Sequence, residues 1–210
     1  SPADELTCTA VVSDDNGGVA SLSHSIVVEN TLPSVDNVLI DAEEEVFTGE
    51  QLNCSASASD LNDGDLTQSI SYGWANQNGD ILGIAPNLSL TASNSETGDQ
   101  ISCTATAVDE DGGQASLSFA VVVGNLVPNA GVVVVEPEFP TSQDDLSCAS
   151  EGAFDPDGDD VTLSYQWTID GEIQSESGQE LGGPFAVNAQ IGCRVTPNDS
   201  KADGAVVSSN

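Results

Sequence analysis

The sequence predicts an all-β fold of tandem β-sandwiches, and three observations support this fold class. Short segments of alternating or β-branched apolar residues, such as LTCTAVV, ISCTATAV and SLSFAVVV, recur about every 8–12 residues without helical periodicity. Turn signals rich in Gly, Asn and Asp, including NGG, DGG and DPDGD, separate these segments. The chain also repeats itself with a period of roughly 90–95 residues, which is a common size for one domain.

The repeat is clearest in two pairs of segments. Residues 99–123, DQISCTATAVDEDGGQASLSFAVVV, resemble residues 4–28, DELTCTAVVSDDNGGVASLSHSIVV. Residues 146–160, LSCASEGAFDPDGDD, resemble residues 52–65, LNCSASASDLNDGD. The correspondences that follow are Cys8 with Cys103, Asn30 with Asn125, Pro33 with Pro128, Cys54 with Cys148, and Trp74 with Trp167.

These correspondences divide the chain into three parts. Residues 1–31 match only the second half of a unit, so we expect them to form the last two strands of a preceding domain. The alternative for this segment is assembly with another chain by strand addition to a sheet edge. Residues 32–125 are expected to form a complete domain, and residues 126–210 a second domain that breaks off inside its last strand.

The order Cys, Trp, Cys within each full unit resembles the immunoglobulin-like fold, and in particular the Ig-like and PKD-like tandem repeats of large bacterial surface and secreted proteins. The resemblance implies a first Cys on strand B, a core Trp on strand C and a second Cys on strand F. The implied disulfides are Cys54–Cys103 and Cys148–Cys193, and the implied core tryptophans are Trp74 and Trp167. Cys8 would then pair with a cysteine outside this segment. Buried free thiols packed against each Trp are the alternative.

Acidic loops are the sharpest chemical feature of the chain. In the resembled topology the B–C and F–G loops lie at the end of the domain where its N-terminus enters. Carboxylates gathered there repel one another unless a cation neutralises them, and Ca²⁺ takes about 6–8 oxygen ligands. The candidate metal ligands are Asp60, Asn62, Asp63 and Asp65 in the first B–C loop, Asp155, Asp157, Asp159 and Asp160 in the second, and Asp109 and Asp111 in an F–G loop. The alternative is a set of solvated turn residues, because Asp, Asn and Gly are ordinary turn formers.

The charge balance excludes several classes of partner. Lys and Arg total 2 against 35 Asp and Glu, which gives a formal net charge of −33. Nucleic-acid binding and docking on anionic membranes both need clustered Lys and Arg, so neither is expected. Direct membrane insertion is not expected either, because no apolar run reaches the roughly 20 residues of a membrane helix. A calcium-titrated surface and solubility in salty water both fit such a charge.

Catalysis is not expected of this chain. Its single His24 corresponds to Phe119 and alternates with apolar residues, which indicates a structural role. Without a second His and with almost no Lys or Arg, nucleophile–base arrangements are missing. We therefore predict a non-enzymatic, extracellular or cell-surface protein of bacterial type, acting as a semi-rigid adhesin stalk or filament whose partners are the neighbouring repeats of the same chain.

The linkers, VVENTLPSVD and VVGNLVPNAG, are short and contain Pro, which limits bending and suits a stalk. Self-association into fibres through open sheet edges would be compatible with this role. Two other functions stay open. One is a carbohydrate-binding accessory module of a secreted enzyme, which would need exposed aromatic side chains. The other is a secreted hydrolase domain that uses a carboxylate pair.

Overall fold

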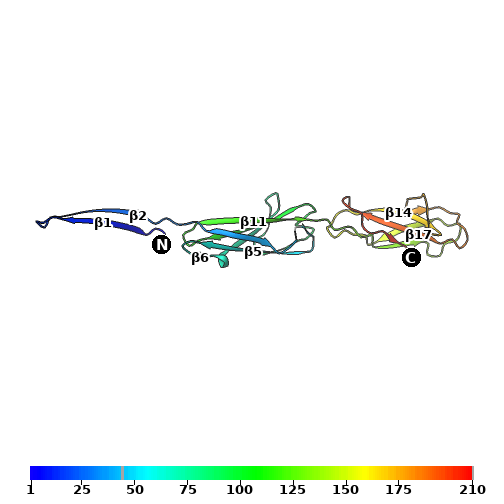
Figure 1. Cartoon of the computed structure of the whole chain (residues 1–210). Helices are drawn as coiled ribbons and strands as arrows, with labels where there is room; N and C mark the ends of the chain where they lie inside the picture. Colours follow the sequence, from blue (N-terminus) through cyan, green and yellow to red (C-terminus); the bar gives the residue numbers. More distant parts are fainter. Residues whose placement is uncertain (44, 210) are drawn as a thin grey trace. The chain divides into compact units, whose positions relative to one another are not determined.

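The computed structural model describes residues 1–43 and 45–209 and confirms the predicted all-β fold class of Ig-like sandwiches (Figure 1). Glu44 and Asn210, which fall within the domains expected at 32–125 and 126–210, lie outside the described residues. Within these described residues the strands form five separate sheets, of which one is a hairpin and the other four make two sandwiches. Among the described residues, no helix has the length and apolar character needed to cross a membrane.

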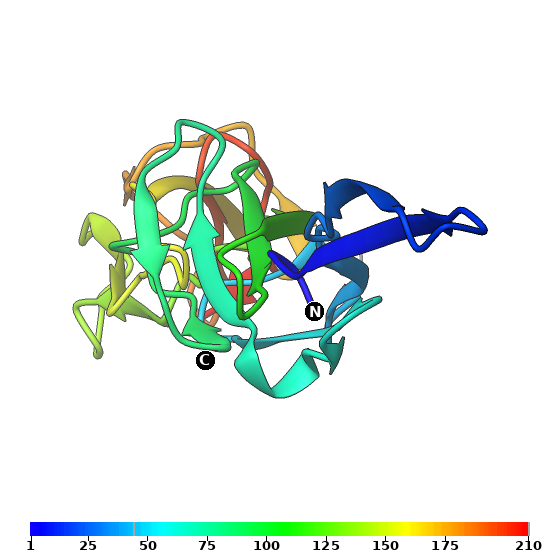
Figure 2. The same ribbon diagram turned by 90° about the vertical axis from the view of Figure 1, so that its left-hand side faces the viewer.

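The N-terminal hairpin consists of β1 (Glu5–Ser13) and β2 (Val19–Val27), paired antiparallel in unbroken register. Its turn is closed by Asp14, whose carboxylate accepts hydrogen bonds from the amides of Asn16 and Gly18, both at 2.8 Å. The hairpin is a two-stranded sheet of its own, visible as the blue ribbon in Figure 2, and every residue of its two strands is exposed. Such a two-stranded unit is at best marginally stable in water by itself.

The first sandwich is built from two sheets and one helical turn. One sheet contains β3 (Ser34–Ile40), β5 (Gln51–Asp60), β6 (Gly64–Asp65) and β9 (Asn87–Ser89). The other runs in the order β4 (Glu45–Val46), β11 (Gln114–Val123), β10 (Gln100–Val108), β7 (Ser71–Ala75) and β8 (Ile81–Gly83). The 3₁₀ turn η1 (Thr67–Ser69) follows β6. Strand β10 alternates buried small or apolar residues with hydroxyl-bearing ones, the period of two expected when one face of a strand meets the core.

The second sandwich repeats this plan with a three-stranded and a four-stranded sheet. The three-stranded sheet has the order β12 (Val132–Glu136), β13 (Leu146–Glu151) and β16 (Glu180–Leu181). The four-stranded sheet has the order β15 (Glu172–Ile173), β14 (Thr162–Ile169), β17 (Ile191–Asn198) and β18 (Val207–Ser208). Its core consists of Ala130, Val133, Leu146, Cys148, Trp167, Leu181, Cys193 and Val195, all buried. These are mostly small side chains, so the core depends on tight packing around one large aromatic residue.

A disulfide joins the two sheets of each sandwich. Cys54 on β5 is bonded to Cys103 on β10, with Cα atoms 6.4 Å apart. Cys148 on β13 is bonded to Cys193 on β17, with Cα atoms 6.2 Å apart. These are the pairs that the Ig-like resemblance implies. Cys8 on β1 is exposed and forms no disulfide within the described residues.

Each disulfide lies beside a buried tryptophan. Trp74 on β7 and Trp167 on β14 are each directly opposite the second Cys of their own sandwich in the strand register. Their exposed fractions are 1% and 0%. The indole N–H of Trp74 donates to the carbonyl of Ala85, and that of Trp167 to the carbonyl of Gly178, both at 2.9 Å. The indole can therefore be fully buried without leaving its polar atom unpaired.

Candidate functional site

The acidic loops of the first sandwich meet the linker that leads into it. The B–C loop follows β5 and the F–G loop follows β10, and they touch where the carboxylate of Asp63 accepts a hydrogen bond from the amide of Glu110 at 3.0 Å. The side chain of Asn30, in the linker, donates to the Oδ2 atom of Asp109 at 2.9 Å. The expected convergence of these loops at the N-terminal end of the domain is therefore present.

The second sandwich has the same arrangement. Asn125, the repeat counterpart of Asn30, donates from its side chain to the Oδ2 atom of Asp199 at 2.9 Å. The two aspartates are equivalent as well, since Asp199 follows Cys193 at the spacing by which Asp109 follows Cys103. We call these two Asn–Asp pairs, Asn30–Asp109 and Asn125–Asp199, the linker clamps. Each clamp ties a linker to the module that the linker enters.

The clamp aspartates are buried as charged groups. Asp109 is 6% exposed and Asp199 is 2% exposed. The hydrogen bond from Asn30 lowers the pKa of Asp109 below its ordinary value, while burial opposes this and the amides of the F–G loop reinforce it. Burial raises the pKa of Asp199, but hydrogen bonds from Asn125 and from the amides of Ala202 and Lys201 outweigh it, so this pKa also lies below its ordinary value.

The B–C loop of the first sandwich satisfies its own acidic residues. The Oδ1 atom of Asp60 accepts from the amides of Asn62 and Asp63, at 2.7 and 3.0 Å. The hydroxyl of Thr31 lies against the carboxylate of Asp60 and donates to the side-chain oxygen of Asn62. Neutral amide donors of the loop therefore hold this buried carboxylate.

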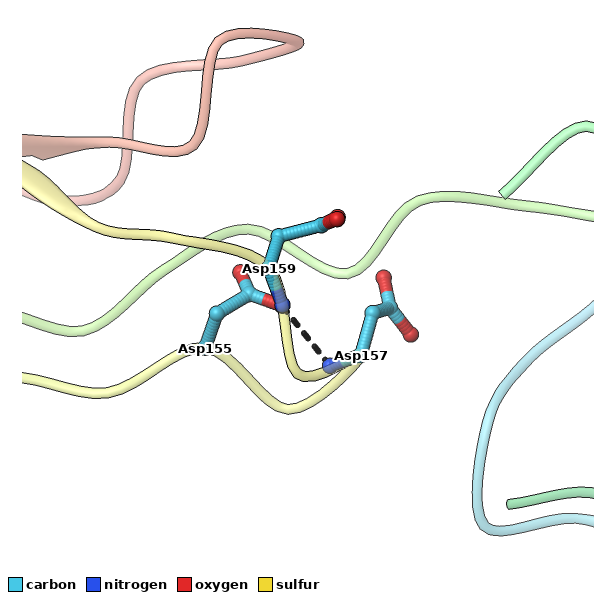
Figure 3. Close-up of side chains that lie close together, drawn as sticks. All are labelled: Asp155, Asp157 and Asp159. Atoms are coloured by element: carbon cyan, nitrogen blue, oxygen red, sulfur yellow. Dashed lines mark hydrogen bonds between the residues drawn. The ribbon is translucent and has the colours of Figure 1, made fainter. Parts of the chain in front are cut away.

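The B–C loop of the second sandwich is different, because three aspartate side chains lie close together on one turn (Figure 3). One oxygen each from Asp155, Asp157 and Asp159 lies within 4.8 Å of the others. The amide of Asp157 donates to Asp155 at 2.7 Å, and the amide of Leu126 donates to the Oδ2 atom of Asp157 at 2.6 Å. The Oδ2 atom of Asp155 and the Oδ1 atom of Asp157 are buried without a hydrogen-bond partner in the protein.

Lys201 supplies the positive charge next to this turn. It is one of two Lys and Arg residues in the whole chain, and its Nζ atom lies 2.5 Å from the Oδ2 atom of Asp159. The hydrogen bond to Asp159 raises the pKa of Lys201, burial opposes the rise, and the charges of Asp159, Asp157 and Asp199 add to it. The ammonium is thus held in its charged form.

The other predicted ligands do not join such a group. Asp160 is exposed. Asp65 accepts a hydrogen bond from the amide of Thr67 at 2.9 Å at the start of the 3₁₀ turn, and hydrogen bonding by Thr67 lowers the pKa of Asp65. Asp111 is exposed, and its backbone amide donates a hydrogen bond to the carboxylate of Asp109. Within residues 1–43 and 45–209, the triad of the second sandwich is the group in which three carboxylates come within 4.8 Å.

Sequence reasoning did not single out four residues of these sites: Asn30, Thr31, Asn125 and Lys201. The repeat alignment already matched Asn30 with Asn125, and polar residues conserved between repeats inside a linker were the available signal. The signal for Lys201 was its rarity in a chain of 35 acidic residues.

No protein-family model matches the chain, and no curated protein is similar to it in sequence. Among solved structures it is similar to a Ca²⁺-stabilised adhesin with which an Antarctic bacterium binds ice, at 15% identity and a TM-score of 0.34, covering 98% of this chain and 55% of that one. It is similar to a 1.5-MDa bacterial ice-binding adhesin at 13% identity and a TM-score of 0.37, covering 99% and 72%. A third similar structure is mouse protocadherin-24, at 16% identity and a TM-score of 0.32, covering 97% and 77%.

The chain therefore spans about half the length of the first of these structures.

Proposed function

We propose that this chain is part of a non-enzymatic extracellular protein in which tandem Ig-like modules act as a semi-rigid adhesive stalk. The observation that supports the proposal most directly is the pair of linker clamps. Asn30–Asp109 and Asn125–Asp199 use the same atoms at the same 2.9 Å distance in the two modules. A linker fastened to a buried carboxylate has fewer conformations than a free one, and this favours a stalk over a flexible tether.

The disulfides supply the mechanical part of the proposal. They close loops with sequence separations of 49 and 45 residues. By chain-entropy reasoning each stabilises its module by about 4 kcal/mol. Under tension, only the residues outside each closed loop can be pulled out, so a module with a small core keeps most of its length. Disulfides also fit an oxidising compartment, in agreement with a secreted or cell-surface location.

Residues 1–31 are proposed to be the last two strands of a further module of the same kind. On the outer face of the hairpin, the hydroxyls of Thr9 and Ser23 are bonded at 2.7 Å. The corresponding residues Thr104 and Ser118 form the same pair at 2.8 Å in the first sandwich. By this equivalence Cys8 faces the inside of its module and pairs with a cysteine beyond this segment. In the alternative assignment another chain adds its strands to this hairpin, and self-association would then cover the face that carries Cys8.

Calcium is the finer part of the proposal, since bound Ca²⁺ would stiffen the acidic loops that hold the linkers. The neighbouring carboxylates of Asp155, Asp157 and Asp159 support it. Oxygen donors of this type are those that Ca²⁺ prefers in proteins.

The carbohydrate-binding alternative would need exposed aromatic side chains, and neither tryptophan can supply one. Trp74 and Trp167 are 1% and 0% exposed, so neither can stack on a sugar ring. The stalk is therefore the function that these residues support better.

Single-molecule stretching of the 210-residue chain tests the stalk. Without reductant, each sandwich should resist unfolding and should then extend only by the residues outside its disulfide loop. Adding reductant should release a further roughly 150–175 Å per sandwich, the contour length that corresponds to sequence separations of 49 and 45 residues. The double change Cys54→Ser/Cys103→Ser should remove this redox effect from the first sandwich alone. Sandwiches that extend at negligible force while oxidised would contradict the mechanical role.

A further inference from the structure

We propose that the second sandwich carries one Ca²⁺ site, formed by the carboxylates of Asp155, Asp157 and Asp159, and that the equally acidic first sandwich carries none. This inference deepens the calcium part of the proposed function. It is independent of the linker clamps and disulfides, which do not need a metal ion.

The unpaired oxygens of the B–C loop are the first support. Asp157 is 8% exposed, and its Oδ1 atom has no hydrogen-bond partner in the protein. The Oδ2 atom of Asp155, on the same turn, is in the same situation. A carboxylate oxygen removed from water without a donor is strongly unfavourable, and such atoms are rare in folded proteins. Two of them on the turn that also presents Asp159 indicate a bound cation.

The first sandwich shows what is missing from the second. There the hydroxyl of Thr31 lies against Asp60 and donates to the side-chain oxygen of Asn62. The repeat alignment places Leu126 at the position of Thr31, and Asp157 at the position of Asn62. The second sandwich has therefore lost a hydroxyl donor and gained a negative charge at one place. A cation is the partner that compensates both changes.

The local charge fits a divalent ion. The three carboxylates and the neighbouring Asp199 contribute −4, and Lys201, bonded to Asp159 at 2.5 Å, contributes +1. The loop therefore keeps an excess of negative charge, which a divalent cation would reduce.

The geometry favours Ca²⁺ over Mg²⁺. The three oxygens come from alternate residues of one tight turn and lie within 4.8 Å of each other. Ca²⁺ accepts irregular arrangements of about 6–8 oxygen ligands, including waters, whereas Mg²⁺ requires a nearly ideal octahedron.

Calorimetric titration of the whole oxidised chain with CaCl₂, at pH 7 and constant ionic strength, tests the assignment. We expect one Ca²⁺ per chain, and Asp157→Asn should weaken its binding at least about tenfold, as expected when a carboxylate ligand is lost. The matched control is Asp63→Asn, which makes the same charge change in the first B–C loop and should leave affinity and stoichiometry unchanged. Lys201→Gln should strengthen binding, because it removes a competing positive charge from Asp159.

A further variant guards against a folding defect. Leu126→Thr/Asp157→Asn gives the second sandwich the side chains with which the first one folds, so it should keep its circular dichroism spectrum and lose the ion.

Several results would overturn the assignment: no calcium binding, equal binding of Mg²⁺, or equal losses from Asp157→Asn and Asp63→Asn. Loss of the calcium site with intact resistance to stretching would leave the stalk standing. Calcium binding without mechanical resistance would support the calcium site and contradict the stalk.

Discussion

Asn125 is a single side chain that decides how a linker is held. Its side-chain amide donates a hydrogen bond to the carboxylate of Asp199, a residue that is 2% exposed. The other oxygen of this carboxylate accepts hydrogen bonds from the backbone amides of Lys201 and Ala202, at 2.7 and 2.6 Å. Hydrogen bonds to a charged acceptor are stronger than neutral ones, and their loss inside a protein leaves a charge underpaired. The Asn125–Asp199 clamp therefore stabilises the second sandwich and also fixes the position of the linker on it.

Replacing this side chain gives a direct prediction. Asn125→Ala should lower the free energy of unfolding of the second sandwich by about 1–3 kcal/mol, because a buried acceptor loses a charge-assisted partner. Urea unfolding of the oxidised chain measures the change. Asn53→Ala, on an exposed position of β5, is the control and should have a much smaller effect. Equal effects of the two variants would mean that the clamp does not contribute.

The clamp also predicts an acid dependence. The pKa of Asp199 is lowered in the folded state, so its contribution to stability is complete above the ordinary Asp pKa of about 3.9 and is lost as the pH falls through the lower folded value. The melting temperature of the wild type should therefore exceed that of Asn125→Ala by a constant amount at pH 5–7, and the gap should narrow below about pH 4. Thermal unfolding at a series of pH values measures it. A gap that stays constant down to pH 3 would argue against this linkage.

At the scale of elements, equivalent strands have very different surroundings. Ile101 on β10 is 0% exposed, whereas its counterpart Leu6 on β1 is 56% exposed, although both strands carry the same alternation. The period of two gives a strand one apolar face, but the covering of that face depends on a second sheet. The equivalent cysteines differ in the same way: Cys103 forms a disulfide with Cys54 on the second sheet, whereas Cys8 is exposed.

This difference predicts thiol reactivity. A chromogenic disulfide reagent should label one thiol per native chain, because four cysteines are bonded and Cys8 is exposed. Mild oxidation should convert the chain into a covalent dimer, and Cys8→Ser should abolish both the labelling and the dimer. Labelling that persists in Cys8→Ser would show that one of the internal disulfides is open.

At the scale of the whole molecule, 35 acidic residues face 2 basic ones. Repulsion among so many like charges destabilises compact states unless salt screens it. Aromatic residues make up only 4% of the chain, so the cores offer little reserve of apolar burial. The disulfides and the buried tryptophans compensate locally, within each sandwich.

General screening should therefore stabilise the protein. Raising NaCl from about 10 to 150 mM shortens the Debye length from roughly 30 to 8 Å, and the melting temperature should rise by several degrees. KCl should act equally, and Asp157→Asn should show the same rise, since the effect belongs to the net charge. A melting temperature that is independent of both salts would contradict this view of the surface.

The sequence by itself determined the fold class and the repeat. Alternating apolar residues, turn signals and the recurrence of Cys, Trp and Cys are local patterns, and they follow directly from the geometry of a two-sheet sandwich. The same patterns suggested that the acidic loops lie where a linker enters the domain, because the topology of the fold places them there.

Only the tertiary structure decided which acidic residues act together. The two B–C loops look alike in sequence, but Thr31 lies against Asp60 in one, and Asp155 and Asp157 have unpaired oxygens in the other. The distinction depends on contacts between a loop and a linker about 30 residues away in the chain. Hydrogen bonding and desolvation act over a few ångströms in space, so a pattern of neighbouring letters cannot report which carboxylates are paired and which need a cation.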